Sequence, residues 1–339
     1  MKRLLVVLMI AATPYTGAYC GFSKVGTAAA QFLKIGVGAR AVGMGETFVA
    51  IADGASTLYW NPAGIVNISS ITGGVSHSKW LGEISHDYFG LVVPLGDDDG
   101  FGINAVMLNT DEQEITTVEQ PEGTGVYYRV RDLAIGLSYA RSLTDRFSVG
   151  FTAKFIQQDA YNESANALAM DIGTYLQTGF HNLTIGMCVS NFGGTMQLEG
   201  RDLIVLADIN KGIGGEYNPD AQLKTEPWPL PLNFRVGIAM DLLGGMEALI
   251  PVEQNRLTMA VDWNHPNDNN ERVNFGCEYA WNETFYARVG YKLNYDVSNL
   301  TFGAGVRVAI ENQQVAFDYA LVDYKDLGQV SRLSLELKF

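Results

Sequence analysis

Apolar and polar residues alternate along most of the chain after residue 67. In the last run, Leu333, Leu335, Leu337 and Phe339 share one face, while the positions between them are charged or small. Successive side chains of a β-strand point to opposite faces, so a period of two predicts strands with one apolar face. After residue 20 no stretch has the roughly 18 consecutive apolar residues of a membrane-crossing helix.

The alternating runs predict an all-β chain of about fourteen strands, joined in turn by long polar loops and short turns. An even number of strands brings both ends of the barrel to one side of a membrane. The predicted strands cover residues 68–79, 85–95, 100–111, 125–141, 146–159, 166–178, 182–192, 231–242, 254–264, 271–281, 284–295, 299–310, 314–323 and 329–339.

Alternation by itself also fits a soluble sheet with one wet face. Three features favour a closed transmembrane antiparallel β-barrel. The runs have the length of about ten residues that crosses a bilayer when tilted. Aromatic residues such as Trp80, Tyr88 and Tyr295 gather near strand ends, as in the aromatic girdles of such barrels. The final Phe339 resembles the signal that the outer-membrane assembly machinery reads, so we expect that machinery and outer-membrane lipid as partners.

The first residues have the pattern of a secretion signal. Lys2 and Arg3 precede a short apolar core that ends near Ala12, and cleavage fits after Ala18 or Cys20. We therefore predict a Sec-exported protein of the bacterial outer membrane. Its parts are a signal peptide at residues 1–20, an N-terminal plug, or hatch, at residues 21–66 and a barrel at residues 67–339.

Residues 28–65 differ in character from everything that follows. They are rich in Ala and Gly, lack strict alternation and end in a hard turn at Asn61-Pro62. A short segment of small residues ahead of so many strands predicts a plug that the strands enclose. The spacing Gly36-x-Gly38-x-x-Ala41 also fits a dinucleotide-binding loop, but no βαβ unit surrounds it, so we set that interpretation aside.

The same segment carries a family resemblance. The run from Ile35 to Gly45, with Ala50, Ala52-Asp53-Gly54 and the closing Tyr59-Trp60-Asn61-Pro62-Ala63-Gly64, resembles the PorV/PorQ family of outer-membrane proteins, a branch of the FadL-like barrels. The resemblance implies a FadL-like barrel with a plug motif. The residues of that motif are Gly36, Gly38, Arg40, Gly43, Gly45, Asp53, Asn61, Pro62 and Gly64.

The resemblance implies two functions. Members similar to PorV serve type IX secretion: they meet the translocon and collect cargo by its C-terminal domain, so the outer loops would do the work. FadL-like relatives instead move hydrophobic small molecules past a plug that shifts. The loop from Phe192 to Leu230 fits a docking site, because exposed apolar groups rimmed by charge mark interaction sites, and it fits equally well a loop that packs over the barrel mouth. The family resemblance favours the secretion role. The candidate partner residues of the loop are Ile204, Val205, Leu206, Trp228 and Leu230.

Charge adds two expectations. The formal net charge is −14, and such an acidic surface repels nucleic acid. The predicted inner face carries charges of both signs, which indicate either an ion-pair network that holds water and the plug or a substrate path. These inward residues are Arg235, Arg256, Arg288, Lys292, Arg307, Arg332, Asp241, Asp262, Glu278, Glu311, Asp318 and Glu336.

No pattern of catalysis stands out. The chain has no Gly-x-Ser-x-Gly elbow and no convincing triad, so we expect no enzyme and no cofactor. His77 and His86 with Glu83 and Asp87 form a weak metal pattern. The oxygen-rich run from Asp262 to Glu271 forms a weak calcium pattern without the central Gly of a calcium loop. We therefore predict no metal. Cys188 should face inward and Cys277 outward, which excludes a disulfide between them.

Overall fold

The barrel wall consists of fourteen strands. The computed structural model describes residues 25–206, 219–311 and 313–339. The wall strands are β1 (Thr72–Lys79), β2 (Ser85–Pro94), β3 (Asp99–Asn109), β6 (Val130–Thr144), β7 (Phe147–Ala160), β8 (Glu163–Gln177), β9 (Thr184–Gly193), β15 (Asn233–Gly244), β17 (Asn255–Pro266), β18 (Arg272–Trp281), β19 (Phe285–Leu293), β20 (Leu300–Ile310), β21 (Gln313–Asp323) and β22 (Gln329–Lys338).

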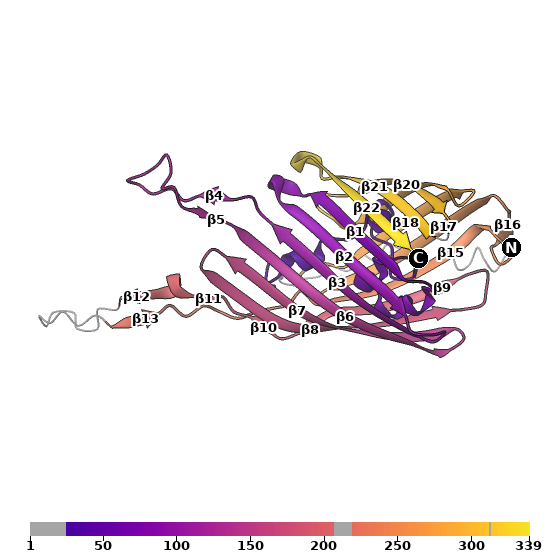
Figure 1. Ribbon diagram of the computed structural model, residues 1–339, viewed down its shortest axis with the longest axis horizontal. Coiled ribbons are helices and arrows are strands. Elements are labelled where there is room, and N and C mark those ends of the chain that lie inside the picture. Colours follow the sequence, from indigo (N-terminus) through magenta and orange to yellow (C-terminus); the bar gives the residue numbers. More distant parts are fainter. Residues whose placement is uncertain (1–24, 207–218, 312) are drawn as a thin grey trace, which may run out of the picture.

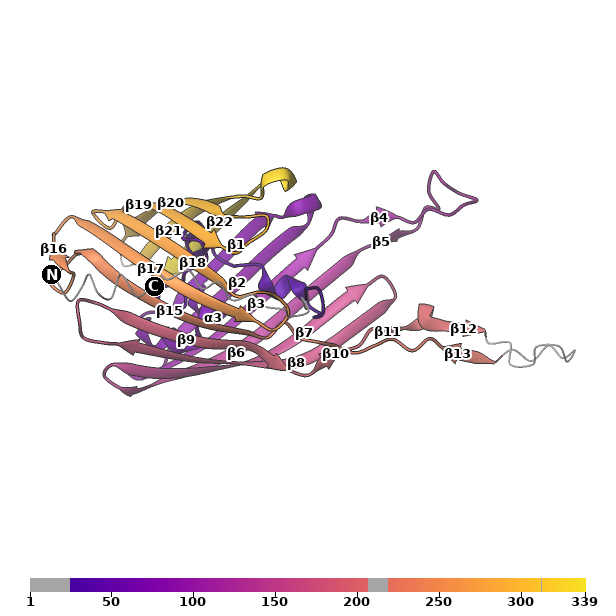
Figure 2. The same ribbon diagram turned by 180° about the vertical axis from the view of Figure 1, so that it is seen from behind.

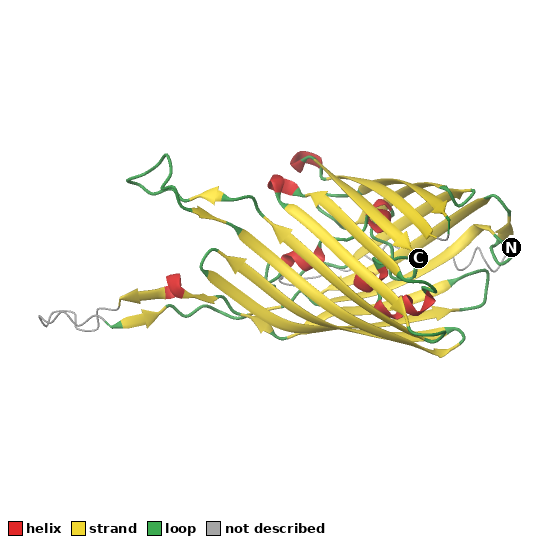
Figure 3. Cartoon of the chain, in the orientation of Figure 1, coloured by secondary structure: helices red, strands yellow, loops and turns green. Residues whose placement is uncertain are grey.

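The wall closes on itself because the first and last strands pair (Figures 1 and 3). β1 and β22 run antiparallel from Thr72 opposite Lys338 to Ser78 opposite Arg332. β9 completes the ring by pairing with both β8 and β15. Closure leaves no unpaired strand edge in the wall. In lipid, each backbone amide on such an edge would lack a hydrogen-bond partner, at a cost of several kcal/mol. The predicted closed antiparallel barrel of fourteen strands is confirmed.

The burial pattern follows the predicted alternation. On β19, Phe285 and Val289 are 51% and 43% exposed, whereas Arg288 and Lys292 on the opposite face are buried. The outer face is thus apolar, as lipid requires, and the charged side chains point into the barrel. Among the helices of the described residues, none has the length and apolar character needed to cross a membrane.

Two strands begin later than the sequence predicts. Residues 62–67 form the 3-10 helix η2 (Pro62–Asn67), so the first strand begins at Thr72 rather than at residue 68. Residues 125–129 lie outside the wall, because Tyr127 and Tyr128 pair with Glu114 and Gln113 in an outer hairpin. β6 therefore begins only at Val130. The predicted signal peptide at residues 1–20 lies outside the described residues and stays a prediction.

Two hairpins project far beyond the barrel on the side of the long loops (Figure 1). The first arm, residues 110–129, contains β4 (Gln113–Glu114) and β5 (Tyr127–Tyr128). The second arm, formed by the described residues 193–206 and 219–230, contains β10 (Thr195–Met196), β11 (Glu199–Gly200), η4 (Arg201–Leu203), β12 (Ile204–Leu206), β13 (Asp220–Gln222) and β14 (Trp228–Pro229). Because outer loops of such barrels are long and periplasmic turns short, we assign the arms to the outside.

The remaining elements are short. Residues 31–67 form η1 (Gln31–Lys34), α2 (Ala39–Gly43), α3 (Thr57–Trp60) and η2, which lie within the ring of strands in the views from both sides (Figure 2). Outer turns contain η3 (Leu81–Glu83) and η5 (Lys325–Leu327), and β16 (Ile250–Pro251) lies in a periplasmic turn. Cys188 is buried, Cys277 is partly exposed, and both are free, as predicted.

Candidate functional site

The N-terminal segment, residues 28–67, fills the middle of the barrel. Its large side chains are buried, with Phe48, Leu58 and Trp60 at most 2% exposed. α2 contacts β19 to β22 on one side, while η2 contacts β2, β3 and β6 to β8 on the other. The segment therefore spans the lumen from wall to wall. Its role as a plug stays a prediction.

The segment and the wall meet backbone to backbone at glycines. A Cβ on Gly43 would lie 2.9 Å from Cα of Gly303 in β20, and one on Gly45 would lie 3.1 Å from Cα of Gly290 in β19. Glycine weakens a strand by about 0.5–1 kcal/mol, and in strands it often marks the close approach of another backbone. The wall glycines that face the segment come from ten strands, and Gly74 and Gly102 among them meet side chains of the segment rather than its backbone: Gly74, Gly90, Gly100, Gly102, Gly150, Gly173, Gly186, Gly237, Gly276, Gly290 and Gly303.

The predicted motif glycines divide into two groups. Gly43 and Gly45 face the wall, as described above. Gly36, Gly38 and Gly64 instead pack within the segment, where an added Cβ would meet Glu46, Ser56 and Ala52, respectively.

Wall side chains satisfy backbone groups of the segment. The Asp262 carboxylate accepts hydrogen bonds from the backbone N–H groups of Phe48, at 2.9 Å, and Val49, at 3.1 Å. Glu336 accepts one from the backbone N–H of Ala55 at 2.8 Å. A buried backbone amide without a partner costs free energy, so these carboxylates hold the irregular chain in one conformation.

Asn61 and Pro62 fix the final turn of the segment. The Asn61 side chain accepts from the backbone N–H of Ala63, and Pro62 occupies the first position of η2, where its missing N–H is not needed. The Asn61 amide also donates to the carbonyls of Val49, at 2.8 Å, and Thr174 in β8, at 3.0 Å. One side chain therefore joins η2, the middle of the segment and the wall.

Arg40 and Glu278 form the centre of an ion-pair network. Nε and Nη2 of Arg40 each lie 2.8 Å from a carboxylate oxygen of Glu278 in β18. Glu278 also pairs with Arg288 at 2.6 Å and with Arg256 at 3.2 Å, and its side chain has no exposed surface. Of the two interpretations of the inward charges, this geometry fits the network that holds the segment.

Asp53 closes the other end of this network. It pairs with Arg40 at 2.6 Å, with Lys338 at 2.7 Å and with Arg307 at 3.6 Å. Burial alone would raise the pKa of Asp53, but the charges of Arg40, Lys338 and Arg307 hold that pKa well below its usual range. Asp53 therefore stays ionised and joins the segment to β20 and β22.

Further contacts hold the outer half of the segment, and the sequence alone did not identify them. Lys292 pairs with Glu46 at 2.6 Å, and Lys34 pairs with Asp268 at 2.8 Å. The Arg235 guanidinium lies over the Trp60 ring, 5.0 Å from its centroid. Inward Arg and Lys at wall positions were a signal, but the pattern did not say which residue of the segment each one meets.

In the described part of the chain, the residues of the two weak metal patterns do not come together as a set of ligands. His77 points outward and pairs with Asp87 at 2.6 Å, whereas His86 points inward, is buried and contacts Arg332. Opposite faces of the wall separate the two imidazoles. In the calcium pattern, Asp262 accepts hydrogen bonds from the backbone of the N-terminal segment, and Asp268 pairs with Lys34. Among the described residues, no group of three or more His, Cys, Asp or Glu side chains is arranged to hold a metal.

The predicted partner residues of the second arm lie on its surface, with one exception. Ile204, Val205 and Leu206 form β12 and are 51%, 38% and 72% exposed, and Trp228 is 48% exposed. Leu230 is only 3% exposed and packs in the core with the N-terminal segment. The prediction of an exposed Leu230 is therefore wrong, because the chain has already turned back into the barrel mouth at that residue.

A turn between β7 and β8 links the bases of both arms. The rings of Tyr128 in the first arm and Tyr161 in the turn meet edge to face, 6.3 Å apart. Asn162 of the turn donates to the Asp202 carboxylate in the second arm at 2.8 Å. Both arms are thus anchored to the same part of the wall. Phe339 follows β22, is 55% exposed and donates its backbone N–H to Ile71.

Comparisons with known proteins agree with this architecture. The chain is similar in structure to a FadL homologue of Pseudomonas aeruginosa (12% identity, TM-score 0.54, 89% of this chain and 98% of that chain). It is also similar to the Ralstonia pickettii toluene transporter TbuX (14%, 0.53, 89% and 97%) and to the CymD monoaromatic hydrocarbon channel (14%, 0.56, 90% and 98%). At such identities the likeness shows the fold alone. No curated protein sequence matches the chain.

A match between the sequence and a family model identifies the family. A family model described as type IX secretion system protein PorV matches residues 22–264, which include the N-terminal segment and most of the wall. This match and the FadL-like fold together establish an outer-membrane barrel. The chain belongs to the PorV family of type IX secretion system proteins.

Proposed function

We propose that this barrel is an accessory protein of type IX secretion that docks the translocon, secreted cargo or both through its outer arms. The observation that carries the proposal is the run Ile204-Val205-Leu206. Three consecutive apolar residues are exposed on an arm that stands clear of the barrel (Figure 1). Edge strands of this kind pair readily with other chains, and natural proteins rarely leave them uncovered.

The edges of β12 add to this surface. In the described part of the chain β12 pairs only with β13, through Ile204 opposite Gln222 to Leu206 opposite Asp220. A two-stranded hairpin in water is marginally stable by itself. An added strand from a partner would supply the missing pairing, and the C-terminal domain of a cargo protein is the partner that the family resemblance implies.

The N-terminal segment supports a scaffold rather than an enzyme or a conduit. Its backbone lies against wall glycines, and its charges are paired with three strands of the wall, β18, β20 and β22, through Arg40 and Asp53. A segment held in this way would have to break several buried ion pairs in order to shift. Transport of hydrophobic small molecules, as in a FadL-like transporter, remains the second candidate because the fold is shared.

Capture from native outer membranes tests docking. The tagged barrel is compared with a variant that carries Ile204→Thr, Val205→Thr and Leu206→Thr, which keeps β propensity but removes apolar surface. The matched control carries Val297→Thr and Leu327→Thr in two outer turns that belong to neither arm, where the side chains are 41% and 57% exposed. We expect translocon components or cargo with the unchanged and control barrels and loss of both with the arm variant. Equal capture by all three, or capture by none, would refute the proposal.

Uptake into liposomes tests the second candidate. A hydrophobic fluorescent probe is followed with the unchanged barrel and with a barrel that lacks residues 31–67. Faster uptake through the unchanged barrel than through empty liposomes would favour transport. Uptake that rises only after the deletion would show that the segment closes the lumen.

A further inference from the structure

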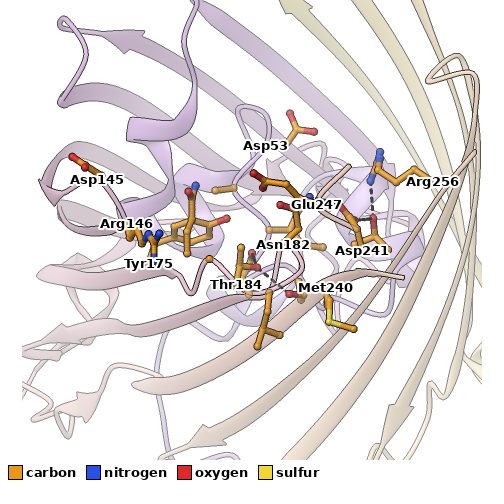
Figure 4. A pocket seen from close by; sticks show the side chains of 18 of the residues that line it. Asp53, Asp145, Arg146, Tyr175, Asn182, Thr184, Met240, Asp241, Glu247 and Arg256 are labelled. Atoms are coloured by element: carbon orange, nitrogen blue, oxygen red, sulfur yellow. Dashed lines mark hydrogen bonds between the residues drawn. The ribbon is translucent and has the colours of Figure 1, made fainter. Parts of the chain in front are cut away.

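A cavity of about 580 Å³ opens at the periplasmic end of the barrel (Figure 4). Its floor is the N-terminal segment from Ala50 to Asp53. Its rim is formed by the turns after β6, β8 and β15, which contribute Asp145, Asn182 and Glu247. Ligand sites have volumes of roughly 300–1,000 Å³, so the cavity is large enough to hold a long side chain and its neighbours.

The rim carries more negative than positive charge. Asp145, Asp241 and Glu247 form no ion pair with any residue that the structure describes, and Arg146 is the base that faces them. The other two bases in the lining, Arg40 and Arg256, are already paired with Glu278. The remaining polar groups include the hydroxyls of Tyr175, Thr184 and Thr258 and can accept hydrogen bonds from a cationic group. The cavity therefore favours a ligand with positive charge.

An exposed apolar ledge borders this cavity. It consists of residues 245–251, where Met246, Leu249 and Ile250 are 91%, 46% and 54% exposed. The ledge is held in place because β16 pairs in parallel with the end of β15 and the backbone N–H of Leu249 donates to the carbonyl of Asp241 at 3.1 Å. The apolar side chains thus stand beside the acidic rim at a fixed distance, at the periplasmic end of the barrel.

We propose that the cavity and the ledge form a docking site for an extended basic segment of a periplasmic polypeptide. A lysine or arginine side chain enters the cavity toward Glu247 and Asp241, and apolar side chains next to it pack on Met246 and Ile250. Charge complementarity selects this occupant. Anionic lipid headgroups and nucleic acid would be repelled by the rim, and a small inorganic cation would leave the ledge uncovered. The site is separate from the outer arms and does not depend on their role.

Binding of model peptides tests the proposal. The probe is a fluorescein-labelled peptide of alternating lysine and leucine, measured by anisotropy against the barrel in zwitterionic nanodiscs at physiological salt, with empty nanodiscs subtracted. The same peptide with glutamate for lysine, and another with serine for leucine, separate charge from apolar contact. All variants are first checked for heat-modifiable electrophoretic mobility, which reports a folded barrel.

Two double variants with the same change of net charge decide the outcome. We expect Asp145→Asn with Glu247→Gln to weaken lysine–leucine binding by about fivefold to tenfold, since each exposed charge contact is worth up to about 1 kcal/mol. Glu119→Gln with Glu122→Gln, in the first arm, should leave binding within about twofold. Met246→Ser with Ile250→Ser should weaken binding of the lysine–leucine peptide but not of the lysine–serine peptide. Equal weakening by both charge variants, or no binding to the unchanged barrel, would overturn the proposal.

Discussion

Glu278 on β18 and Arg40 on α2 form a two-pronged ion pair in which both nitrogen–oxygen distances are 2.8 Å. The same carboxylate also binds Arg288 and Arg256. A single wall residue therefore compensates three guanidinium groups, two of them almost completely buried. This arrangement makes Glu278 the residue on which the attachment of the N-terminal segment depends most.

Replacing Glu278 by glutamine should strongly destabilise the barrel. The change leaves positive charge inside the lumen without its counterion, and removal of one partner from a buried pair costs about 3–5 kcal/mol. Urea unfolding of the barrel in liposomes, followed by tryptophan fluorescence, measures the difference.

The control for this change is Glu112→Gln. Glu112 pairs with Arg129 at 3.1 Å, but both side chains are well exposed, so the loss should be at most about 1 kcal/mol. If the two variants lost the same free energy of unfolding, the network around Glu278 would not be what holds the segment.

The wall could be predicted from the sequence because the alternation within each strand indicates which of its residues face inward and which face outward. The period of two in a run such as residues 329–339 needs no knowledge of any other part of the chain. It located all fourteen strands and assigned residues such as Glu278 and Arg288 to the inside. The match to β22, which ends at Lys338, shows how closely a local signal can define a wall strand.

The partners within the site could not be predicted in the same way. Arg40 meets Glu278, and Glu46 meets Lys292, across more than two hundred positions of sequence, and no periodic pattern encodes such a pairing. The second arm shows the same limit. Its residues look alike in composition, yet Leu206 is exposed and Leu230 is buried, because burial there depends on where the chain re-enters the barrel mouth.

The positions of glycine in the sequence are a further signal that another segment approaches the wall. Inward positions that lack a side chain stand directly opposite one another on neighbouring strands, as in Gly74 with Gly90 and Gly276 with Gly290. A row of such positions predicts that something approaches the wall closely. The pattern becomes visible only when the strands are aligned in register.

Replacing Gly303 by alanine should displace the segment. The new Cβ would lie 3.1 Å from Cα of Gly43, and neither backbone can move aside without breaking its strand or helix contacts. Overpacking of this kind costs about 1–3 kcal/mol. Gly194→Ala is the matched control, since nothing lies within 4 Å of its added Cβ. Hydrogen exchange of residues 39–45 should increase in the first variant only. Equal exchange in both would contradict a close backbone contact.

The contribution of Asp53 should depend on pH in a defined direction. Its pKa is held below the ordinary value of about 3.9 by three cations, so its ion pairs stabilise the fold fully above that value. The stabilisation is lost as the pH falls through the lower pKa of the folded state. We expect the difference in unfolding free energy between the unchanged protein and Asp53→Asn to be constant from about pH 5 to 8 and to shrink below about pH 4. A difference that instead fell between neutral pH and about pH 5 would contradict a lowered pKa.

Val289 tests whether the outer face meets lipid. It lies near the middle of β19, points outward and is 43% exposed, as is typical of a residue at the centre of the lipid-facing band. Val289→Arg should therefore cost about 2–4 kcal/mol in a bilayer, because charge at that depth is desolvated.

Val205→Arg in the second arm is the matched change in water. Val205 is 38% exposed, so Val205→Arg should change the unfolding free energy of the barrel by at most about 0.5 kcal/mol. Both variants are unfolded by denaturant from the same liposomes. A soluble sheet would tolerate arginine at either position, so an equal and small effect of the two changes would exclude lipid around β19. A large loss confined to Val289→Arg would show that the apolar face of this strand is turned to the membrane.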